Sequence, residues 1–260
     1  MICNYHTHTY RCHHATGGER EYIENAISGG IRKLGFSDHI PFVFPDGYES
    51  AYRISFSDCD DYISTLRKYR EEYRNKIEIK IGFEMEYYPK YFDEMFKVAL
   101  DAGAEYLILG QHFLNNEHPN GHYCGFPSDS DEGLHEYVNC VIAGINTGVF
   151  TYVAHPDLFN YTGGYFTYEK EMRRLCAAAA RADIPLEINL LGIRTGRNYP
   201  NPTFWRIAGE ECCKAVFGFD AHTAKDAFDA KSIPIAERLA DECGLLVVDD
   251  PKIVDISVKP

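Results

Sequence analysis

The chain has 260 residues, of which 45% are hydrophobic and 25% charged, a composition typical of a globular protein with a sizeable core. Its formal net charge of -13 argues against binding nucleic acid or a membrane surface through the overall electrostatic field. The charge does not exclude a small phosphorylated partner, because bound metal ions reverse the sign of the local potential.

The nine cysteines are scattered and form no C-x-x-C pair, which predicts reduced thiols in a cytoplasmic protein. The first residues lack a basic region followed by an apolar run, so we expect no signal peptide. Apolar stretches stay well below the roughly 20 residues needed to span a bilayer. The sequence carries no signal for an oligomeric state.

Short β-rich runs alternate with amphipathic stretches along the whole chain. Seven runs are expected to be strands: Ile2–His6, Leu34–Asp38, Ile77–Glu84, Tyr106–Gln111, Thr151–Ala154, Leu186–Asn189 and Ala215–Phe219. A last run, Leu245–Asp249, predicts either an eighth strand or a closing segment. Strict alternation indicates parallel strands joined by right-handed crossovers. With neither a repeat nor a linker, we expect one domain over residues 1–260.

Three helices are clearest between these strands, and two of them end near Gly103 and Gly148. The first begins at Ser57 and Asp58. Their inward-facing residues are Tyr62, Ile63, Leu66, Tyr69 and Tyr73, then Phe92, Met95, Phe96, Ala99 and Leu100, then Leu134, Tyr137, Val138, Val141, Ile142 and Ile145. So many strand–helix units favour a closed α/β barrel, although a doubly wound sheet also fits the alternation.

Two predicted connections, Ile40–Phe56 and Leu114–Ser130, are unusually long. Connections of this length in a compact domain are more often functional than idle.

Almost every predicted strand ends in a side chain that can bind a metal ion. These side chains are His6 and His8, Asp38 and His39, Glu84, His112, His155, and Asp220 and His222. The carboxyl ends of parallel strands in a barrel meet on one face, so we expect these groups to converge. Imidazoles suit zinc, iron and manganese, and carboxylates can bridge two cations.

Each group also has an ordinary structural explanation when it is taken alone. A buried histidine is usually hydrogen-bonded into the core, Glu84 could pair with a cation, and Asp220 could cap a helix. Recurrence at successive strand ends favours the metal site. His118, His122 and His135 lie outside the pattern and are expected on the surface or in loops.

Six short motifs occur in a fixed order along the chain. They are His6-Thr7-His8 with Cys12-His13-His14-Ala15, Gly35-Phe36-Ser37-Asp38-His39, Gly82-Phe83-Glu84-Met85-Glu86-Tyr87, Gly110-Gln111-His112-Phe113, Ala154-His155-Pro156-Asp157-Leu158 and Gly218-Phe219-Asp220-Ala221-His222. Together they resemble the polymerase and histidinol phosphatase (PHP) superfamily, and within it the monofunctional histidinol-phosphatases. The resemblance implies a single distorted (β/α)7 TIM-like barrel with a metal site at the carboxyl ends of its strands.

The resemblance further implies three metal ions, of zinc, manganese or iron. The ligand sets would be His6, His8, Glu84 and Asp220 for the first ion, Glu84, His112 and His155 for the second, and His14, His39 and His222 for the third. Family spacing selects His14 over His13. It also selects Glu84 over Glu86 as the bridge, which leaves Glu86 to support a ligand.

The implied reaction is hydrolysis of L-histidinol phosphate to L-histidinol and phosphate, in histidine biosynthesis, by a water molecule that the metal ions activate. The residues expected to take part in catalysis are Asp220, Glu84 and His222. Asp220 would transfer a proton to or from the reacting groups.

Arginines are expected to bind the substrate phosphate. Arg194 is the first candidate, because Glu187 to Pro200 resembles the family stretch E-x-N-x-x-G-x-R followed by Y-P. Arg197 is the second candidate and Arg11 the third, and His39 is also expected at the substrate. The acidic, aromatic loop Asn115–Asp131 could hold the ammonium and imidazole groups, through Glu117, His122, Tyr123 and Phe126.

Three alternatives remain open at this point. One is a phosphatase of the same fold that acts on a sugar phosphate, a nucleotide or phosphotyrosine. Another is a barrel amidohydrolase, which also opens with His-x-His but needs a lysine after a middle strand, where Gln111-His112 stands here. The third is a non-catalytic module, which is disfavoured because every expected ligand position is filled.

Overall fold

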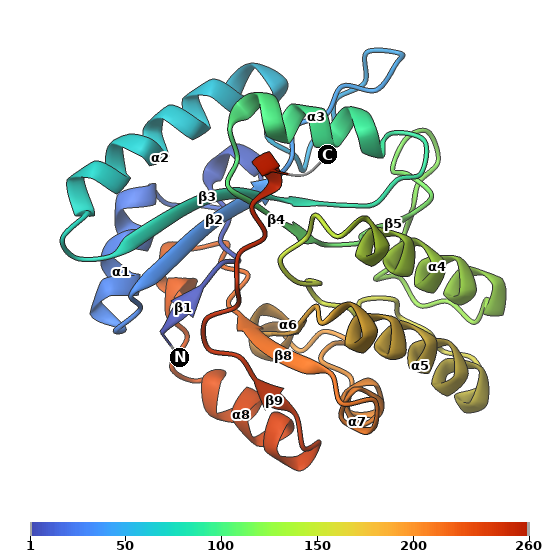
Figure 1. Ribbon diagram of the computed structural model, residues 1–260. Helices are drawn as coiled ribbons and strands as arrows, with labels where there is room; N and C mark the ends of the chain where they lie inside the picture. The colour runs from blue at the N-terminus through green and yellow to red at the C-terminus, as the bar shows by residue number, and fades with distance from the viewer. Residues whose placement is uncertain (1, 259–260) are drawn as a thin grey trace.

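A curled sheet of parallel strands forms the centre of the fold, and helices cover its outer face (Figure 1). The computed structural model describes residues 2–258. Four strands lie side by side in chain order, namely β1 (Cys3–Asn4), β2 (Lys33–His39), β3 (Glu78–Met85) and β4 (Tyr106–Leu109). A second group consists of β7 (Leu186–Asn189), β8 (Lys214–Gly218) and β9 (Leu246–Val247). All neighbours in both groups are parallel, as the alternating pattern predicts.

Single pairings join the two groups of strands. Val153 pairs in parallel with Leu109 of β4 and with Leu186 of β7. Thr7, beyond β1, pairs with Ala221, beyond β8. The run predicted as a strand at Thr151–Ala154 therefore lies between β4 and β7 with Val153 as its bridging residue, and Thr151 and Ala154 donate backbone hydrogen bonds to Leu107 and Leu109 of β4.

Eight helices are described between and after these strands. They are α1 (Glu19–Ser28), α2 (Cys59–Tyr73), α3 (Phe92–Ala102), α4 (Asp131–Thr147), α5 (Tyr165–Ala182), α6 (Leu190–Thr195), α7 (Pro202–Glu210) and α8 (Ile233–Glu242). Short 3-10 helices are η1 (Tyr10–Cys12), η2 (Phe56–Asp58), η3 (Ala224–Ala227) and η4 (Ile256–Val258). Within residues 2–258, no helix combines the length and the apolar character needed to cross a membrane.

The three helices predicted from apolar spacing are confirmed as α2, α3 and α4. Gly103 (φ 72°) and Gly148 (φ 64°) end two of them in the left-handed conformation that favours glycine. Most predicted inward-facing residues are buried. Leu100 was expected inward but is 38% exposed, because Met95 and Ala99 define the face of α3 that meets the core.

The long connection predicted at Leu114–Ser130 contains part of a small antiparallel hairpin, β5 (Phe113–Leu114) with β6 (His122–Tyr123). The other long connection, Ile40–Phe56, carries only an isolated bridge between Val43 and Glu49 before η2 begins. Both follow strands at their carboxyl ends, so both can border a site on that face.

The C-terminal segment crosses the end of the curled sheet at which the strands begin, opposite their carboxyl ends (Figure 1). Val248 and Ile253 pack there against a small apolar cluster that includes Tyr5, Tyr106 and Tyr152. The amino ends are thus filled by apolar side chains, and the polar groups at the carboxyl ends remain free to form a site.

Ile256 tests the contribution of this C-terminal segment to the core. It lies in η4 and is fully buried, whereas Ile235 in α8 is 54% exposed. Because truncation leaves a cavity in the core, Ile256→Ala should lower the free energy of unfolding by about 2–5 kcal/mol. In denaturant titrations, Ile235→Ala is the matched control and should cost under about 0.5 kcal/mol. Equal, small effects of both variants would contradict this packing.

Candidate metal centre

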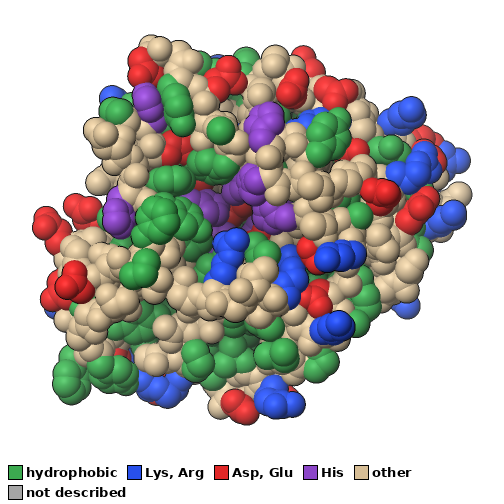
Figure 2. Space-filling model, turned by 180° about the vertical axis from the view of Figure 1, so that it is seen from behind, with side chains coloured by type: hydrophobic (Ala, Val, Ile, Leu, Met, Phe, Trp, Pro, Cys, Tyr) green, Lys and Arg blue, Asp and Glu red, His purple; other side chains and the backbone are tan. Residues whose placement is uncertain are grey.

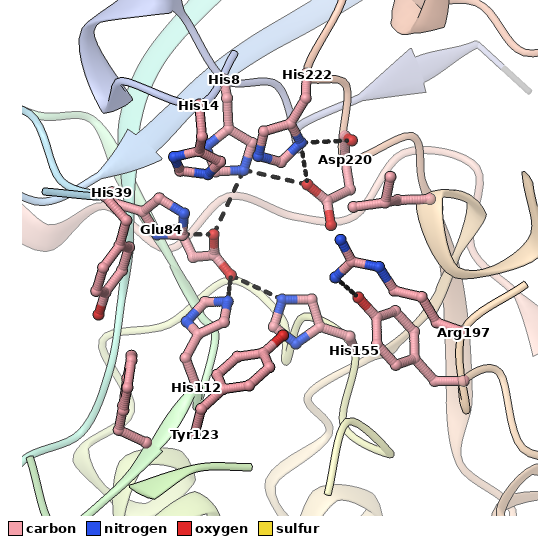
Figure 3. Close-up of a pocket in the computed structure, with 14 residues that line it drawn as sticks. His8, His14, His39, Glu84, His112, Tyr123, His155, Arg197, Asp220 and His222 are labelled. Carbon is pink, nitrogen blue, oxygen red and sulfur yellow. Dashed lines mark hydrogen bonds and ion pairs between the residues drawn. The ribbon is translucent and has the colours of Figure 1, made fainter. Parts of the chain in front are cut away.

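The nine side chains predicted as metal ligands come together at the carboxyl ends of the strands. Figure 2 shows histidines gathered in a hollow on this face of the molecule. Eight of the nine line a cavity of about 330 Å³, as the close-up in Figure 3 shows, and these are His8, His14, His39, Glu84, His112, His155, Asp220 and His222. The ninth, His6, is fully buried and contacts Glu84 and Asp220. The sequence therefore located this cluster, while metal binding by its members stays a prediction.

Glu84, near the end of β3, lies at the centre of the cluster (Figure 3). Each of its two carboxylate oxygens faces a different group of imidazoles. Oε2 lies 3.4 Å from His6 Nε2, 3.5 Å from His8 Nε2 and 3.3 Å from His39 Nδ1. Oε1 lies 3.4 Å from His112 Nε2 and 2.9 Å from His155 Nε2. A carboxylate placed in this way can bridge two cations.

Several buried polar atoms in this cluster have no hydrogen-bond partner. They are His6 Nε2, His8 Nε2, His39 Nδ1, Glu84 Oε2 and Asp220 Oδ1. An unsatisfied buried polar atom costs roughly 1–3 kcal/mol, so five such atoms facing one another favour a common ligand. Nitrogen lone pairs and carboxylate oxygens are the donors that zinc, manganese and iron accept, so these residues fit a cation.

A second group of nitrogens lies at the outer side of the cluster. His14, His39 and His222 each offer a ring nitrogen, and these atoms lie within 4.8 Å of one another. His13 does not belong to this group, and its Nε2 lies 3.3 Å from the hydroxyl of Ser55. The choice of His14 over His13, which followed from family spacing, matches this arrangement.

Carboxylates behind the histidines set their orientation. Nδ1 of His6 lies 2.8 Å from Glu187 Oε1, and Nδ1 of His112 lies 2.8 Å from Glu86 Oε1. Nδ1 of His8 lies 3.3 Å from Asp38 Oδ1. When Nδ1–H donates to a carboxylate, the Nε2 lone pair is left to face the centre, as in many metal sites.

Sequence reasoning expected a supporting role for Glu86 but missed those of Glu187 and Asp38. Both residues stand at or near strand ends, which was the available signal. The histidine that each one faces depends on pairing between distant strands and could not be read from the chain.

Two glycines make room for the buried carboxylates. A Cβ atom at Gly110 would overlap Glu84 Oε1, and a Cβ atom at Gly218 would overlap Glu187 Oε1. These glycines follow β4 and end β8, so the neighbouring strands leave space for carboxylate side chains inside the sheet.

Backbone conformation also shapes the centre. His155 (φ 30°) and Asp220 (φ 47°) adopt left-handed conformations that cost non-glycine residues about 1–3 kcal/mol each.

Asn189 donates through Nδ2 to Glu187 Oε2 (2.9 Å) and Asp220 Oδ2 (3.1 Å). Asp220 is therefore held on one oxygen, while its other oxygen faces the histidines.

The charges within the cluster depend on one another. Burial alone would raise the pKa of Glu84, but the imidazoles of His112, His6 and His39 hold it well below its usual range. Burial would likewise raise the pKa of Asp220, which His6 and His222 lower well below its usual value. Both carboxyl groups are ionised at neutral pH and available to cations.

The two leading candidate arginines lie differently with respect to the cavity. Arg194 donates to the backbone carbonyl oxygens of Phe219 (2.6 Å) and Asp220 (2.7 Å), and it lies outside the lining of the cavity. Arg197 does line the cavity, and its Nη1 donates to the Tyr199 hydroxyl at 2.8 Å. The helix α6 ends at Gly196 (φ 66°), which turns Arg197 away from the side of Arg194.

The third candidate and the proposed ammonium ligand are also placed elsewhere. Arg11 is buried against Glu19 and Asp61. Glu117, expected to contact substrate, pairs instead with Arg53 and the Tyr52 hydroxyl and lies outside the cavity lining. Sequence could not show that a buried arginine in the other long connection would bind it.

The remaining histidines lie away from the centre. His118 Nε2 bonds to Asp46 Oδ2 at 2.6 Å, His122 is exposed, and His135 lies 3.1 Å from Glu171 Oε2. None of the three lines the cavity.

Glu187→Gln tests the support behind His6. The amide preserves the shape of the side chain but removes the charge that orients the imidazole, so we expect metal affinity to fall by about 10–100-fold. Glu171→Gln is a matched control, because Glu171 is also a buried carboxylate that contacts a histidine outside the centre. Competition with a chelator measures both variants, and equal affinities would exclude this role of Glu187.

Comparisons with known proteins identify the family of this chain. A family model described as the PHP domain matches residues 4–190. The chain is 27% identical over 226 residues to a probable histidinol-phosphatase of Deinococcus radiodurans, covering 85% of this chain and 86% of that protein. It is 25% identical over 252 residues to the histidinol-phosphatase of Bacillus subtilis, covering 85% of this chain and 93% of that protein.

Among solved structures, the histidinol phosphate phosphatase of Lactococcus lactis, complexed with zinc, L-histidinol and phosphate, is similar in fold. Its TM-score is 0.75 at 20% identity, and the match covers 98% of this chain and 97% of that chain. The match to the PHP domain spans residues 4–190, which carry seven of the nine clustered side chains, and this chain belongs to the PHP domain family.

Proposed function

We propose that this protein is a metal-dependent phosphomonoesterase that hydrolyses L-histidinol phosphate to L-histidinol and phosphate. The observation that carries the proposal is the set of unpaired, buried nitrogen and oxygen atoms around Glu84, which lies beside a cavity large enough for a small molecule. Similarity over most of the chain to curated histidinol-phosphatases supports the choice of substrate.

In the proposed centre, three ions would be held at the mouth of a seven-stranded barrel, in which Val153 counts as the fifth strand and β9 as a closing segment outside the seven. The ligand sets are His6, His8, Glu84 and Asp220, then Glu84, His112 and His155, then His14, His39 and His222. The pairs of contacts to the two oxygens of Glu84 support the first two sets, and the cluster of three ring nitrogens supports the last.

When bound, such ions lower the pKa of water towards about 7 and neutralise charge on phosphoryl oxygens. The chain's own residues would do the rest of the work. Asp220 Oδ1 lies 3.2 Å from His8 Nε2 and from His222 Nδ1, without a hydrogen-bond partner. Held through Oδ2 by Asn189, Asp220 would accept a proton from the attacking water and return it to the leaving alkoxide.

Arg197 would bind the non-bridging phosphoryl oxygens. Figure 3 shows its guanidinium directed into the cavity between Asp220 and the tyrosine to which it donates. A guanidinium presents several donors to one phosphate, which suits a dianion held opposite the ions.

Aromatic side chains would receive the leaving group. The rings of Tyr52 and Phe113 stack at 5.6 Å, and the ring of Tyr123 lies 5.7 Å from Phe113. All three line the cavity, and a planar imidazole fits against such a wall.

One observation favours a second candidate, a phosphatase for neutral aromatic esters such as phosphotyrosine. The only carboxylates among the described lining residues are Glu84 and Asp220, so the ammonium of histidinol has no carboxylate of its own in the cavity. A substrate panel separates the two functions.

The experiment compares L-histidinol phosphate with phosphotyrosine, a nucleoside monophosphate and a sugar phosphate, using metal-reconstituted protein. We expect kcat/KM to be at least about 100-fold higher for L-histidinol phosphate than for the others. Chelation should abolish turnover of every ester, and returning the metal should restore it. A higher kcat/KM for phosphotyrosine would replace the first candidate with the second, and turnover that survives complete metal removal would reject both.

Arg197→Met tests the phosphate contact. Loss of the charge-assisted bonds should lower kcat/KM by about 100–1000-fold, while metal content stays unchanged because Arg197 belongs to none of the proposed ligand sets. Arg206→Met is the control, since Arg206 pairs with Glu210 on the surface. Steady-state kinetics and metal analysis measure both variants, and unchanged kcat/KM in Arg197→Met would remove this residue from the site.

A further inference from the structure

We infer that Arg53 is a positioning residue that holds the proposed metal ligand His112 through Glu86 and couples it to the cavity wall. The inference rests on the proposed function, because it takes His112 to be a ligand. Arg53 lies in the long connection between β2 and η2 and is 1% exposed, which is unusual for a charged side chain.

The guanidinium of Arg53 is fully engaged by its neighbours. Nη2 donates to Glu86 Oε2 at 2.5 Å, Nη1 donates to the carbonyl of Ile40 at 3.1 Å, and Nε donates to Glu117 Oε1 at 2.9 Å. The side chains of Glu86 and Glu117 are 0% and 2% exposed. The charged ends of all three residues are therefore withdrawn from water.

Glu86 connects Arg53 to the proposed metal centre. Its other oxygen, Oε1, lies 2.8 Å from His112 Nδ1, so it fixes both the tautomer and the direction of the imidazole. The opposite nitrogen of His112, Nε2, lies 3.4 Å from Glu84 Oε1. A continuous chain of contacts thus runs from Glu117 through Arg53 and Glu86 to the centre.

The same group of residues fixes one wall of the cavity. The Tyr52 hydroxyl donates to Glu86 Oε1 (3.2 Å) and also contacts Glu117, while the Tyr52 ring lines the cavity and meets His39 edge-on at 5.0 Å. The cavity wall at Tyr52 and the proposed ligand His112 are therefore held by the same residues, so a displacement of Arg53 would move both.

The charge count favours a cation near His112. One buried guanidinium faces two buried carboxylates, Glu86 and Glu117, so these three residues carry an excess negative charge. Buried ion pairs contribute little to stability after the cost of desolvation. The excess charge instead strengthens the hydrogen bond that His112 donates, and makes its Nε2 a better electron donor to a metal ion.

A purely structural role makes a different prediction. Arg53 also fastens the connection 40–56 to the loop that carries Glu117, so it could act only as a link between loops. In that case its loss would lower stability and affect every metal site alike. Selective loss of one ion distinguishes positioning of His112 from such a link.

The experiment titrates metal-free protein with zinc alone against a competing chelator and counts the binding steps. Variants are Arg53→Met, Arg53→Lys and Glu117→Gln. Arg70→Met is the matched control, because Arg70 pairs with Glu105 away from the centre. We expect Arg53→Met to weaken one binding step by about 10–100-fold and to leave the others near their parent values.

Arg53→Lys, which keeps the charge but loses the fork of donors, should fall between the parent and Arg53→Met. Glu117→Gln should weaken the same step by a smaller factor, because it removes the excess charge while keeping the shape. If Arg53→Met fails to fold, Glu117→Gln provides the test of the inference in its place. Unchanged steps in Glu117→Gln and Arg53→Lys, or equal weakening of all steps, would overturn the inference. Absence of zinc binding by the parent protein would instead contradict the proposed function.

Discussion

The structure depends most on one buried carboxylate that two groups of imidazoles share. Glu84 is almost fully buried, and its two oxygens face five histidine nitrogens at 2.9–3.5 Å. Without a cation, the carboxylate oxygens can be satisfied only by imidazoles that carry a proton, which concentrates charged groups inside the protein at a considerable cost in free energy. Bound metal ions would convert the same contacts into favourable ligation. The groups that determine the stability of this region are therefore the same groups that would bind the metal ions.

The rest of the fold serves to make that concentration of polar groups possible. Parallel strands bring six separate segments to one face, and glycines at positions 110 and 218 leave space for carboxylates where a Cβ atom would collide with them. Left-handed backbone at His155 and Asp220 aims two more groups at the same point. Apolar side chains and the C-terminal segment fill the amino ends of the strands. The candidate site therefore lies at their carboxyl ends.

The sequence was informative about the cluster because strand ends obey a simple geometric rule. Side chains that follow parallel strands meet on one face, so eight of the nine clustered residues could be predicted without knowing any contact between them, and His14 was added by the spacing of the family motif. The helices α2, α3 and α4 were equally readable, since their apolar spacing and terminal glycines act locally. A strand was predicted at Thr151–Ala154, but the reduction of its pairing to Val153 was not foreseen, because that pairing depends on both neighbouring strands.

Contacts of long polar side chains could not be predicted in the same way. Arg194 matched a family stretch, yet its guanidinium donates to the backbone carbonyls of Phe219 and Asp220 rather than lining the cavity. Glu117 lay in an acidic loop that suited a cationic substrate, but it pairs with Arg53 from a distant connection. Such partners are chosen in three dimensions, among several cations and carboxylates that the sequence presents as equivalent.

The central claim is that the atoms around Glu84 bind metal ions. Anomalous diffraction from crystals of the metal-reconstituted protein tests it most directly. The account predicts ions on both sides of the Glu84 carboxylate, each about 2.0–2.2 Å from a Glu84 oxygen and coordinated by the histidines that face it. Anomalous peaks located elsewhere, with Glu84 bound to none of them, would contradict it.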